Sequence, residues 1–330
     1  STSRRQRQMC IRDRFISEYI SYMTGEVYLC VISCYTKYES KTYRLFMRRN
    51  LVGIIVLILL SVRVVNAQTV ADSIAIVTAP WEVVTVENGI VHKRASIPFL
   101  YQGAQSINIL EINPRTGKKI GIAFTGQLEK ISRIARKHQA IGAINGSYFD
   151  MTKGNSVCFL KVGSQVVDTT SLDELKLRVT GAVYEKKGKV KLIPWDRQIE
   201  KNYKKNKGSV LASGPLMLKD GEYYDWSQCN ANFIETKHPR SAICLTEEGK
   251  ILFVTVDGRS PENAVGINIP ELAHLLHVLG GKDALNLDGG GSTALWLSGA
   301  PEEGIVNFPC DNRNYDHQGE RKVANFLYVH

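Results

Sequence analysis

The 330-residue sequence lacks several features that would assign it to a simple class. It has no CxxC pair, so a zinc site of that type is unsupported. No internal repeat is visible, and no Pro/Ser-rich linker divides residues 68–330. The hydrophobic fraction of 44% and the charged fraction of 22% are close to globular averages. Together these observations exclude collagen-like, coiled-coil and wholly disordered chains.

Most of the chain also lacks an excess of positive charge. The formal net charge is +10, but residues 1–67 hold 11 of the 42 Lys and Arg residues and only 4 of the 32 Asp and Glu residues. The other 263 residues carry 31 basic and 28 acidic side chains, a net charge of +3. A body so nearly balanced does not favour a surface that follows nucleic-acid phosphates, and we expect no nucleic-acid partner.

Residues 47–67 have the order of features of a secretory signal peptide. Met47–Asn50 is basic, Leu51–Leu60 is almost purely apolar, and Val65–Ala67 resembles an A-x-A cleavage site. The apolar run is shorter than the ~20 residues that span a bilayer. We therefore expect an exported, periplasmic or extracellular protein without stable membrane insertion after cleavage. A buried helix or a membrane anchor is the alternative interpretation of the apolar run.

The residues before this signal do not resemble part of a folded protein. They show no helical or strand period, and Met9–Arg14 resembles translated read-through of a sequencing adaptor. We interpret residues 1–46 as upstream, non-native translation that begins before the true start at Met47. The remaining segments are a signal peptide at 47–67, lead-in strands at 68–104 and a main domain at 105–330.

Four cysteines lie in the body: Cys158, Cys229, Cys244 and Cys310. An exported chain permits disulfides, and four cysteines allow three pairings. The other interpretation is that these cysteines are buried apolar thiols, because a domain of this size does not need disulfides for stability. We expect at most two disulfides and none that is essential to the fold.

Short strand-like runs dominate the body, and helical runs are few. Strand patterns occur at 81–86, 90–92, 106–112, 119–124, 140–145, 157–162, 181–184, 190–193, 210–213, 241–256 (a hairpin), 284–287, 293–297 and 323–329. Helical spacing occurs at 127–138 and 270–279, and the lysine-rich stretch 195–207 predicts an exposed helix or loop. The pattern predicts an α+β (mixed α/β) fold, a single domain of many short strands in a mixed sheet with a few helices.

His274 and His277 lie three residues apart on the predicted helix 270–279. This spacing suits a metal pair, but no third ligand lies nearby in the sequence. Packed or surface histidines are the preferred interpretation, and we expect no metal and no cofactor.

Polar residues and glycines gather where four predicted strands begin or end. These clusters are Asn145–Asp150, Ser213–Pro215, His238–Ser241 and Leu287–Thr293. In the fourth cluster Asp288 ends a buried strand, and three glycines follow that let a ligand approach the main chain. Successive N–H groups there can form an anion-binding nest, and Ser292 and Thr293 add hydroxyl groups.

This glycine cluster is neither a P-loop nor a dinucleotide fingerprint. The P-loop lysine is missing, and no long helix follows the glycines. A tight turn between two strands is the plainer alternative, but three glycines are more than a turn needs.

Arginines and carboxylates lie at the ends of the same elements. Arg240 and Arg259 bracket the predicted hairpin, and the planar guanidinium suits phosphate or carboxylate. Asp257 and Glu271 also lie at or beside element ends. Glu271 has an alternative role, because a carboxylate in the first turn of a helix interacts favourably with the helix dipole. These groups fit cleavage of a sugar that carries an anionic leaving group, and they fit mere binding of one equally well.

An ordered set of motifs between Ile107 and Val329 resembles the phosphodiester glycosidase family. The matching stretches are Ala143–Phe149, Ala212–Pro215, His238–Ile243, Val256–Arg259, Ile269–Leu279, Leu285–Thr293 and Arg321–Asn325. Their order is far more specific than any one of them. The lead-in Gln68–Tyr101 has no counterpart, and Cys244 stands where the family often has glycine.

The resemblance implies hydrolysis of a sugar-1-phosphodiester, of the N-acetylglucosamine-1-phosphodiester type, between the anomeric carbon and a phosphate oxygen. We expect the reaction to belong to cell-surface or host glycan metabolism. From the residues themselves we expect Asp288 or Asp257 to act as nucleophile or as base toward water, with Glu271 as a weaker candidate. The implied substrate-binding residues are Asn145, Gly146, Tyr148, Ser213, Gly214, Arg240, Arg259, Gly289, Gly290, Ser292, Thr293 and Arg321, with the arginines on the phosphate.

Two other functions fit parts of this pattern. A noncatalytic module for phosphorylated surface glycan needs the arginines and the glycine loop but no poised carboxylate, and release of free sugar distinguishes it. A nuclease-type phosphodiesterase usually needs a divalent metal with clustered His and Asp ligands, which this sequence does not show. Sensitivity to a chelator distinguishes that function.

The leader pattern predicts where the mature protein begins. The exported protein should begin at Gln68, because the signal-like residues end at Ala67. Intact-mass measurement and N-terminal sequencing of the exported chain check this. A mature protein that retains residues 1–46 would contradict it.

Overall fold

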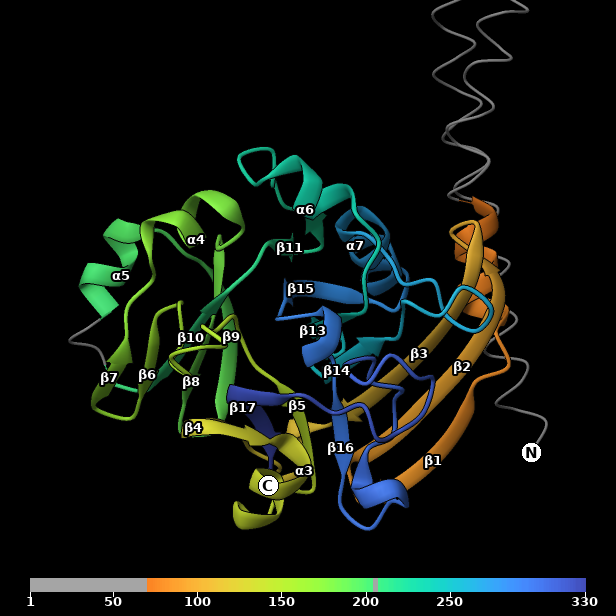
Figure 1. Ribbon diagram of the computed structural model, residues 1–330, viewed down its shortest axis with the longest axis horizontal. Coiled ribbons are helices and arrows are strands. Elements are labelled where there is room, and N and C mark those ends of the chain that lie inside the picture. The colour runs from red at the N-terminus through yellow and green to blue at the C-terminus, as the bar shows by residue number, and fades with distance from the viewer. Residues whose placement is uncertain (1–69, 204–206) are drawn as a thin grey trace, which may run out of the picture. The chain divides into compact units, whose positions relative to one another are not determined.

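The computed structural model describes residues 70–203 and 207–330 (Figure 1). By internal contacts the chain divides into Ser1–Asn66 and Ala67–His330. The upstream segment 1–46 and the signal-like residues 47–67 lie outside the described residues. Among the described residues, no helix is both long and apolar enough to cross a membrane.

Three antiparallel sheets make up the described fold. The eight-stranded sheet contains, in spatial order, β1 (Glu82–Glu87), β2 (Ile90–Leu100), β3 (Gly103–Ile112), β14 (Ile251–Val256), β13 (Arg240–Thr246), β15 (Gly281–Asn286), β11 (Leu216–Lys219) and β12 (Glu222–Tyr223). The five-stranded sheet contains β7 (Gln165–Asp168), β6 (Leu160–Val162), β10 (Ser209–Ser213), β8 (Gly181–Lys186) and β9 (Lys189–Pro194). The four-stranded sheet contains β16 (Leu295–Leu297), β5 (Gly142–Asn145), β17 (Lys322–Val329) and β4 (Ile120–Lys130).

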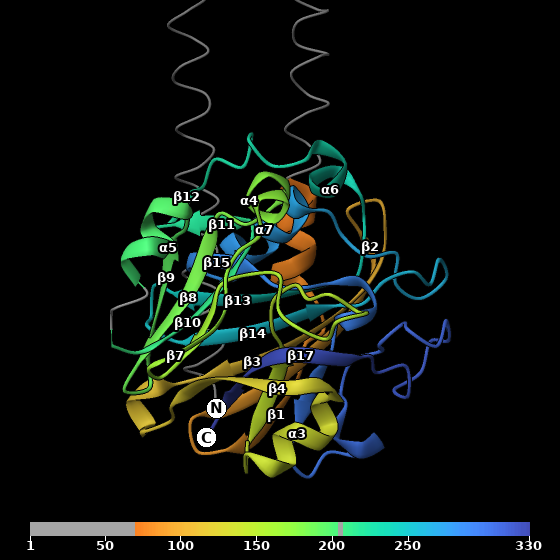
Figure 2. The same ribbon diagram turned by 60° about the vertical axis from the view of Figure 1, so that its left-hand side comes forward.

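Short helices connect and cover these sheets (Figure 2). They are α3 (Ile131–Lys137), α4 (Leu172–Leu177), α5 (Arg197–Tyr203), α6 (Ala231–Glu235) and α7 (Ile269–Val278), together with helical residues 70–78 and the 3₁₀ turns η1 (Pro114–Thr116), η2 (Gly290–Ser292) and η3 (Glu302–Gly304). Figure 2 shows α6 and α7 above the eight-stranded sheet and the four-stranded sheet below it. The predicted α+β class is confirmed, although the strands form three antiparallel sheets rather than one mixed sheet.

The central strands of the eight-stranded sheet are buried on both faces. Ala242 and Cys244 of β13 point into the apolar cluster that includes the inner face of α7. Ile243, between them, points into a second cluster with strands of the other two sheets. Successive side chains of a strand face opposite sides, so a strand covered on both faces must be apolar without interruption. This double covering holds the ends of β13 and β15 on a rigid base.

The lead-in strands belong to the same sheet. β2 pairs with β3 from Ile90 opposite Ile112 to Leu100 opposite Gly103, and β1 continues the sheet beyond β2. The expected helix 127–138 is shorter than its periodicity suggested. Residues up to Lys130 continue β4, because β17 supplies backbone partners as far as Lys322 opposite Lys130.

Helix α7 forms as the sequence predicts. Asn268 accepts a hydrogen bond from the N–H of Glu271, and the Glu271 carboxylate accepts one from the N–H of Asn268, which completes a capping box. His274 is held by Ser73 Oγ at 3.0 Å from Nε2 and by Tyr101 Oη at 2.7 Å from Nδ1. These contacts agree with the packed interpretation of this histidine. The described residues contain no group of three or more potential metal-binding side chains.

The sequence predicts an exposed element at 195–207, but this is wrong for Trp195 and Glu200, which are buried. Trp195 is 3% exposed, and its Nε1 donates to Glu200 Oε2 at 3.2 Å. The other Glu200 oxygen accepts from the N–H of Thr170 at 3.2 Å. A tilted stack of Trp195 on Phe159, with centroids 5.2 Å apart, covers the five-stranded sheet here. The lysine-rich composition conceals these two anchor residues.

The structure leaves the four cysteines of the described chain unpaired. Cys158, Cys244 and Cys310 are buried. The fourth, Cys229, is half-buried, and burial raises the pKa of its thiol to about 11. We therefore predict that adding a thiol reductant leaves the melting temperature of the mature protein unchanged. Calorimetry with and without reductant measures this, and a drop of more than about 4 °C would show that a disulfide supports the fold.

Candidate active site

Strand ends from all three sheets meet at one place. β5 ends at Asn145, β10 at Ser213 and β15 at Asn286. Asn145 is fully buried; its Nδ2 donates to the main-chain oxygen of Asp288 at 2.6 Å, and its Oδ1 accepts from Ser241 Oγ at 2.6 Å. The Ser213 hydroxyl donates to the main-chain oxygen of Asn286 at 2.9 Å. The sequence clusters at 145, 213 and 288 are therefore one site.

Tyr148 forms part of the buried wall beside this junction. Its hydroxyl donates to the main-chain oxygen of Gly214, and Asn286 Nδ2 donates to the Tyr148 hydroxyl at 2.9 Å and to the Gly214 oxygen at 2.8 Å. Burial raises the pKa of Tyr148 well above its ordinary value. Tyr148 is therefore a neutral hydrogen-bonding residue, and Gly214 contributes a carbonyl group.

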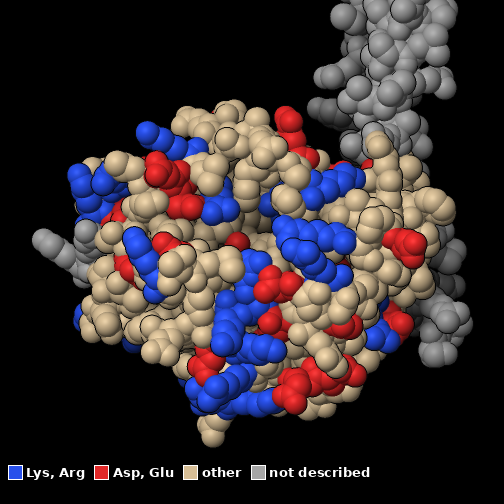
Figure 3. Space-filling view, in the orientation of Figure 1, with Lys and Arg blue, Asp and Glu red and all other residues tan. Residues whose placement is uncertain are grey.

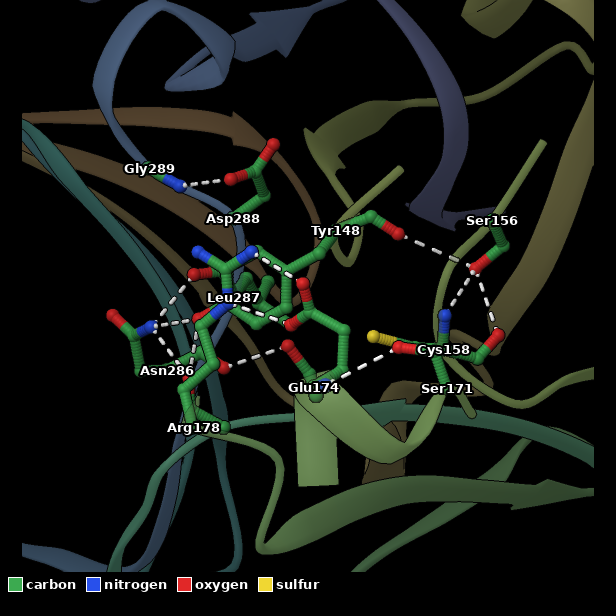
Figure 4. A network of polar contacts seen from close by, with 12 residues as sticks. Tyr148, Ser156, Cys158, Ser171, Glu174, Arg178, Asn286, Leu287, Asp288 and Gly289 are labelled. Carbon is green, nitrogen blue, oxygen red and sulfur yellow. Dashed lines mark hydrogen bonds and ion pairs between the residues drawn. The ribbon is translucent and has the colours of Figure 1, made fainter. Parts of the chain in front are cut away.

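Asp288 begins the glycine loop that follows β15. Leu287 is fully buried, whereas Asp288 is partly exposed and accepts from the N–H of Gly289 at 2.9 Å (Figure 4). Burial raises the pKa of the Asp288 carboxyl group. The Ser292 hydroxyl, the Arg178 guanidinium and the Gly289 N–H oppose that rise by favouring the ionised form.

Close neighbours crowd all three glycines of the loop. A Cβ atom at Gly289 would lie 2.6 Å from the main-chain oxygen of Pro239. A Cβ atom at Gly290, where φ is +61°, would lie 2.9 Å from Arg259 Nη2, and one at Gly291 would lie 2.5 Å from Arg321 Nη2. The loop therefore brings two guanidinium groups against its own main chain, which a simple tight turn does not require.

Arg259 and Arg321 border this loop from different segments. Arg321 Nε donates to Asp311 Oδ1 at 2.9 Å, and Arg259 is exposed with its Nη1 3.8 Å from Cys310 Sγ. Figure 3 shows a hollow near the centre of the face seen in Figure 1, bordered by Lys and Arg side chains. The arrangement suits an anion next to a carboxylate.

Several buried polar atoms of these segments have no hydrogen-bond partner within the described chain. They include Thr293 Oγ1, Asn286 Oδ1 and Asn325 Nδ2. Buried polar groups are normally paired, so a concentration of unpaired ones indicates a place that water or a ligand completes. Gly146 belongs to the same junction, because a Cβ atom there would lie 2.1 Å from Asn325 Oδ1.

Arg240, expected on the phosphate, is instead engaged by the protein. It is 2% exposed; its Nε donates to the carbonyl of Ile267 at 3.2 Å, and its Nη2 donates to those of Phe233 and Thr236 at 3.0 and 2.9 Å. Burial lowers the pKa of Arg240 to about 10. These contacts tie the start of β13 to α6.

The other two carboxylate candidates also have structural partners. Asp257 is fully buried and accepts from Ser106 Oγ at 2.7 Å, Asn307 Nδ2 at 2.9 Å and the N–H of Phe308 at 2.9 Å. Burial raises the pKa of Asp257. Glu271 completes the α7 capping box and pairs with Lys237 Nζ at 2.9 Å. Asp288 is thus the candidate carboxylate that lies on the glycine loop.

Sequence reasoning missed Arg178, which caps α4. Its guanidinium carbon lies 3.5 Å from the centroid of the Tyr148 ring, and Figure 4 shows it close to the Asp288 side chain. An isolated arginine after a short helix carries no motif. The spacing of Glu174 and Arg178, four residues apart, was the one available signal, and it indicates only a helical ion pair.

The phosphodiester glycosidase family matches residues 138–330, and the chain belongs to that family. Mouse N-acetylglucosamine-1-phosphodiester alpha-N-acetylglucosaminidase is 28% identical over 101 residues, which are 30% of this chain and 18% of the mouse protein. The match thus spans less than a fifth of that relative.

Solved structures share the fold. The zebrafish N-acetylglucosamine-1-phosphodiester alpha-N-acetylglucosaminidase catalytic domain, auto-inhibited by its pro-peptide, has a TM-score of 0.59 and 18% identity, over 77% of this chain and 88% of that one. A hypothetical protein from Synechocystis has a TM-score of 0.55 and 16% identity, over 76% of this chain and 63% of that one.

The contacts of Glu271 predict a structural role rather than a chemical one. Glu271→Ala should lower the free energy of unfolding by about 1 kcal/mol through loss of the capping box, and leave turnover within about twofold. Urea unfolding and turnover of a sugar-1-phosphodiester measure both. Asn268→Ala is the matched control, since it removes the cap without removing a carboxylate. Loss of activity in Glu271→Ala alone would restore Glu271 as a catalytic candidate.

Proposed function

We propose that this protein hydrolyses a sugar-1-phosphodiester, of the N-acetylglucosamine-1-phosphodiester type, between the anomeric carbon and the phosphate oxygen. One observation carries the proposal: the partly exposed Asp288 carboxylate begins a glycine loop against which Arg259 and Arg321 are packed. A group able to act on the sugar thus lies beside positive charge that suits the phosphate. Membership of the phosphodiester glycosidase family supports the reaction class.

Asp288 acts on the sugar side of the bond. It either takes a proton from the attacking water or attacks the anomeric carbon itself, and water then releases the sugar. In both routes the bond from the anomeric carbon to oxygen breaks, and its electron pair leaves with the phosphate monoester. The anomeric configuration of the first-formed sugar distinguishes the two routes.

The phosphate side needs charge stabilisation more than a general acid. A phosphate monoester is a good leaving group as an anion, so the reaction does not require a second carboxylic acid beside Asp288. The guanidinium groups of Arg259 and Arg321 and the N–H groups of the loop stabilise the charge that develops on the departing oxygen. Asp257 contributes by holding the Asn307–Phe308 segment.

The leader bears on the setting of the reaction. The signal-like residues 47–67 support an exported enzyme that acts in the periplasm or outside the cell on surface or host glycan. A noncatalytic module for phosphorylated glycan would use the same arginines and glycines without needing an ionised Asp288.

Replacement of Asp288 separates catalysis from binding. Asp288→Asn keeps the shape and removes the charge, so the rate of sugar release should fall by about 1000-fold or more, while affinity for the phosphate monoester product changes little. Asp220→Asn, at an exposed turn next to β11, is the matched control and should retain full activity. Near-native sugar release by Asp288→Asn would refute the assignment, and absence of sugar release by the unaltered protein across a substrate panel would favour the binding module.

The acidic limb of the pH–rate profile tests the same residue. The ionised form acts in either route, so the rate should rise with pH as Asp288 loses its proton. Burial raises the pKa of Asp288, so this limb should lie above the ~3.9 of an ordinary aspartate.

A further inference from the structure

Arg178 is held in the site by two different contacts. Its Nε and Nη2 donate to the two carboxylate oxygens of Glu174 at 2.7 and 2.9 Å, a bidentate pair across one turn of α4. Its guanidinium carbon also lies over the Tyr148 ring, 3.5 Å from the centroid. Tyr148 is in turn fixed by Gly214 and Asn286. The position of the Arg178 charge is therefore determined by rigid neighbours.

The rest of the Arg178 guanidinium remains available. Among the described residues, no hydrogen bond uses Nη1, and the side chain is 21% exposed. Arg240 provides the contrast, because it is 2% exposed and donates to three main-chain carbonyls. An arginine that serves only the fold is expected to look like Arg240. Arg178 instead keeps a charged edge free beside a partly exposed carboxylate.

The Arg178 charge acts on Asp288. Figure 4 shows the guanidinium between the Glu174 carboxylate and the Asp288 side chain. It is among the groups that favour ionised Asp288, together with Arg321. Arg178 and Arg321 come from segments far apart in the sequence, so the fold brings two positive charges to the same carboxylate.

We propose that Arg178 binds the phosphate of the substrate through its free edge, and that Glu174 is a positioning residue that aims it. This inference rests on the proposed function. Arg178 stabilises the negative charge that grows on the departing phosphate oxygen and keeps Asp288 ionised in the free enzyme. Glu174 balances the Arg178 charge while the site is empty and takes up the two N–H groups that face away from the substrate.

The test compares Arg178→Met with a matched surface variant. Arg178→Met removes the charge and keeps an apolar chain on the Tyr148 ring, whereas Arg133→Met removes an arginine from another i,i+4 pair, with Glu129 at 3.0 Å on the exposed side of α3. For Arg178→Met we expect kcat/KM to fall by at least about 100-fold and the inhibition constant of inorganic phosphate to rise by at least about tenfold. The acidic limb of its pH–rate profile should move to higher pH. Arg133→Met should match the unaltered enzyme in all three.

Two further variants separate binding from structural support. Arg178→Lys keeps the charge but loses the planar fork, so the acidic limb should stay in place while phosphate inhibition weakens. Glu174→Gln should lower kcat/KM by about tenfold without the upward shift of the limb, because the Arg178 charge remains. Methylguanidine added to Arg178→Ala should restore part of the lost rate. If Arg178→Met does not fold, Arg178→Lys and the Glu174 variant carry the test alone.

The outcomes distinguish this inference from the proposed function. In one outcome Asp288→Asn is inactive, while Arg178→Met keeps kcat/KM within threefold, the same inhibition constant for phosphate and the same position of the acidic limb. The role of Arg178 is then wrong, and the proposed function stands. Reduced rates in Arg178→Met and Arg178→Lys, with unchanged phosphate inhibition and no rescue by methylguanidine, would also overturn it, because they indicate structural support alone. If Asp288→Asn remains fully active, the proposed function fails first.

Discussion

The rest of the site depends on the hydrogen bonds of the Asn145 side chain. It is fully buried at the end of β5, in the four-stranded sheet, and its Nδ2 donates to the main-chain oxygen of Asp288 in the loop after β15 of the eight-stranded sheet. Its Oδ1 accepts from Ser241 Oγ and from the N–H of Ala294. One amide therefore joins two sheets and both ends of the glycine loop. In a buried setting each of these bonds would be costly to leave unmade, so the loop has one preferred position.

The arginines around this junction differ in role because they differ in burial and partners. Arg240 is enclosed and satisfied by main-chain carbonyls, so its charge serves the fold. Arg321 donates a hydrogen bond to Asp311 beside the glycine loop, and Arg259 is exposed there. Arg178 is fixed by Glu174 and Tyr148. The residue type is the same in each case, and the surroundings decide whether its charge is available to a ligand.

The carboxylates divide in the same way. Asp257 receives three hydrogen bonds and is closed to solvent, so it anchors the Asn307–Phe308 segment. Glu271 is used by the cap of α7 and by Lys237. Asp288 receives a hydrogen bond from Gly289 and lies partly exposed just after β15, next to the fully buried Leu287. A rigid base with one accessible carboxylate is the arrangement that chemistry at a fixed position requires.

Local pattern determined much of this protein. Apolar runs predicted most strands, and Asn268, Pro270 and Gly280 set the limits of α7. The order of the motifs predicted the family, and the glycine run after a buried strand singled out Asp288. Only the tertiary structure decided which charged groups face the site. Arg240 and Asp257 carry the same charges in sequence as Arg178 and Asp288, but the first two are buried, whereas the second two stay partly exposed. That choice depends on neighbours far apart in the chain, since Arg178 meets Tyr148 and Asn145 meets Asp288 only after three sheets have packed together.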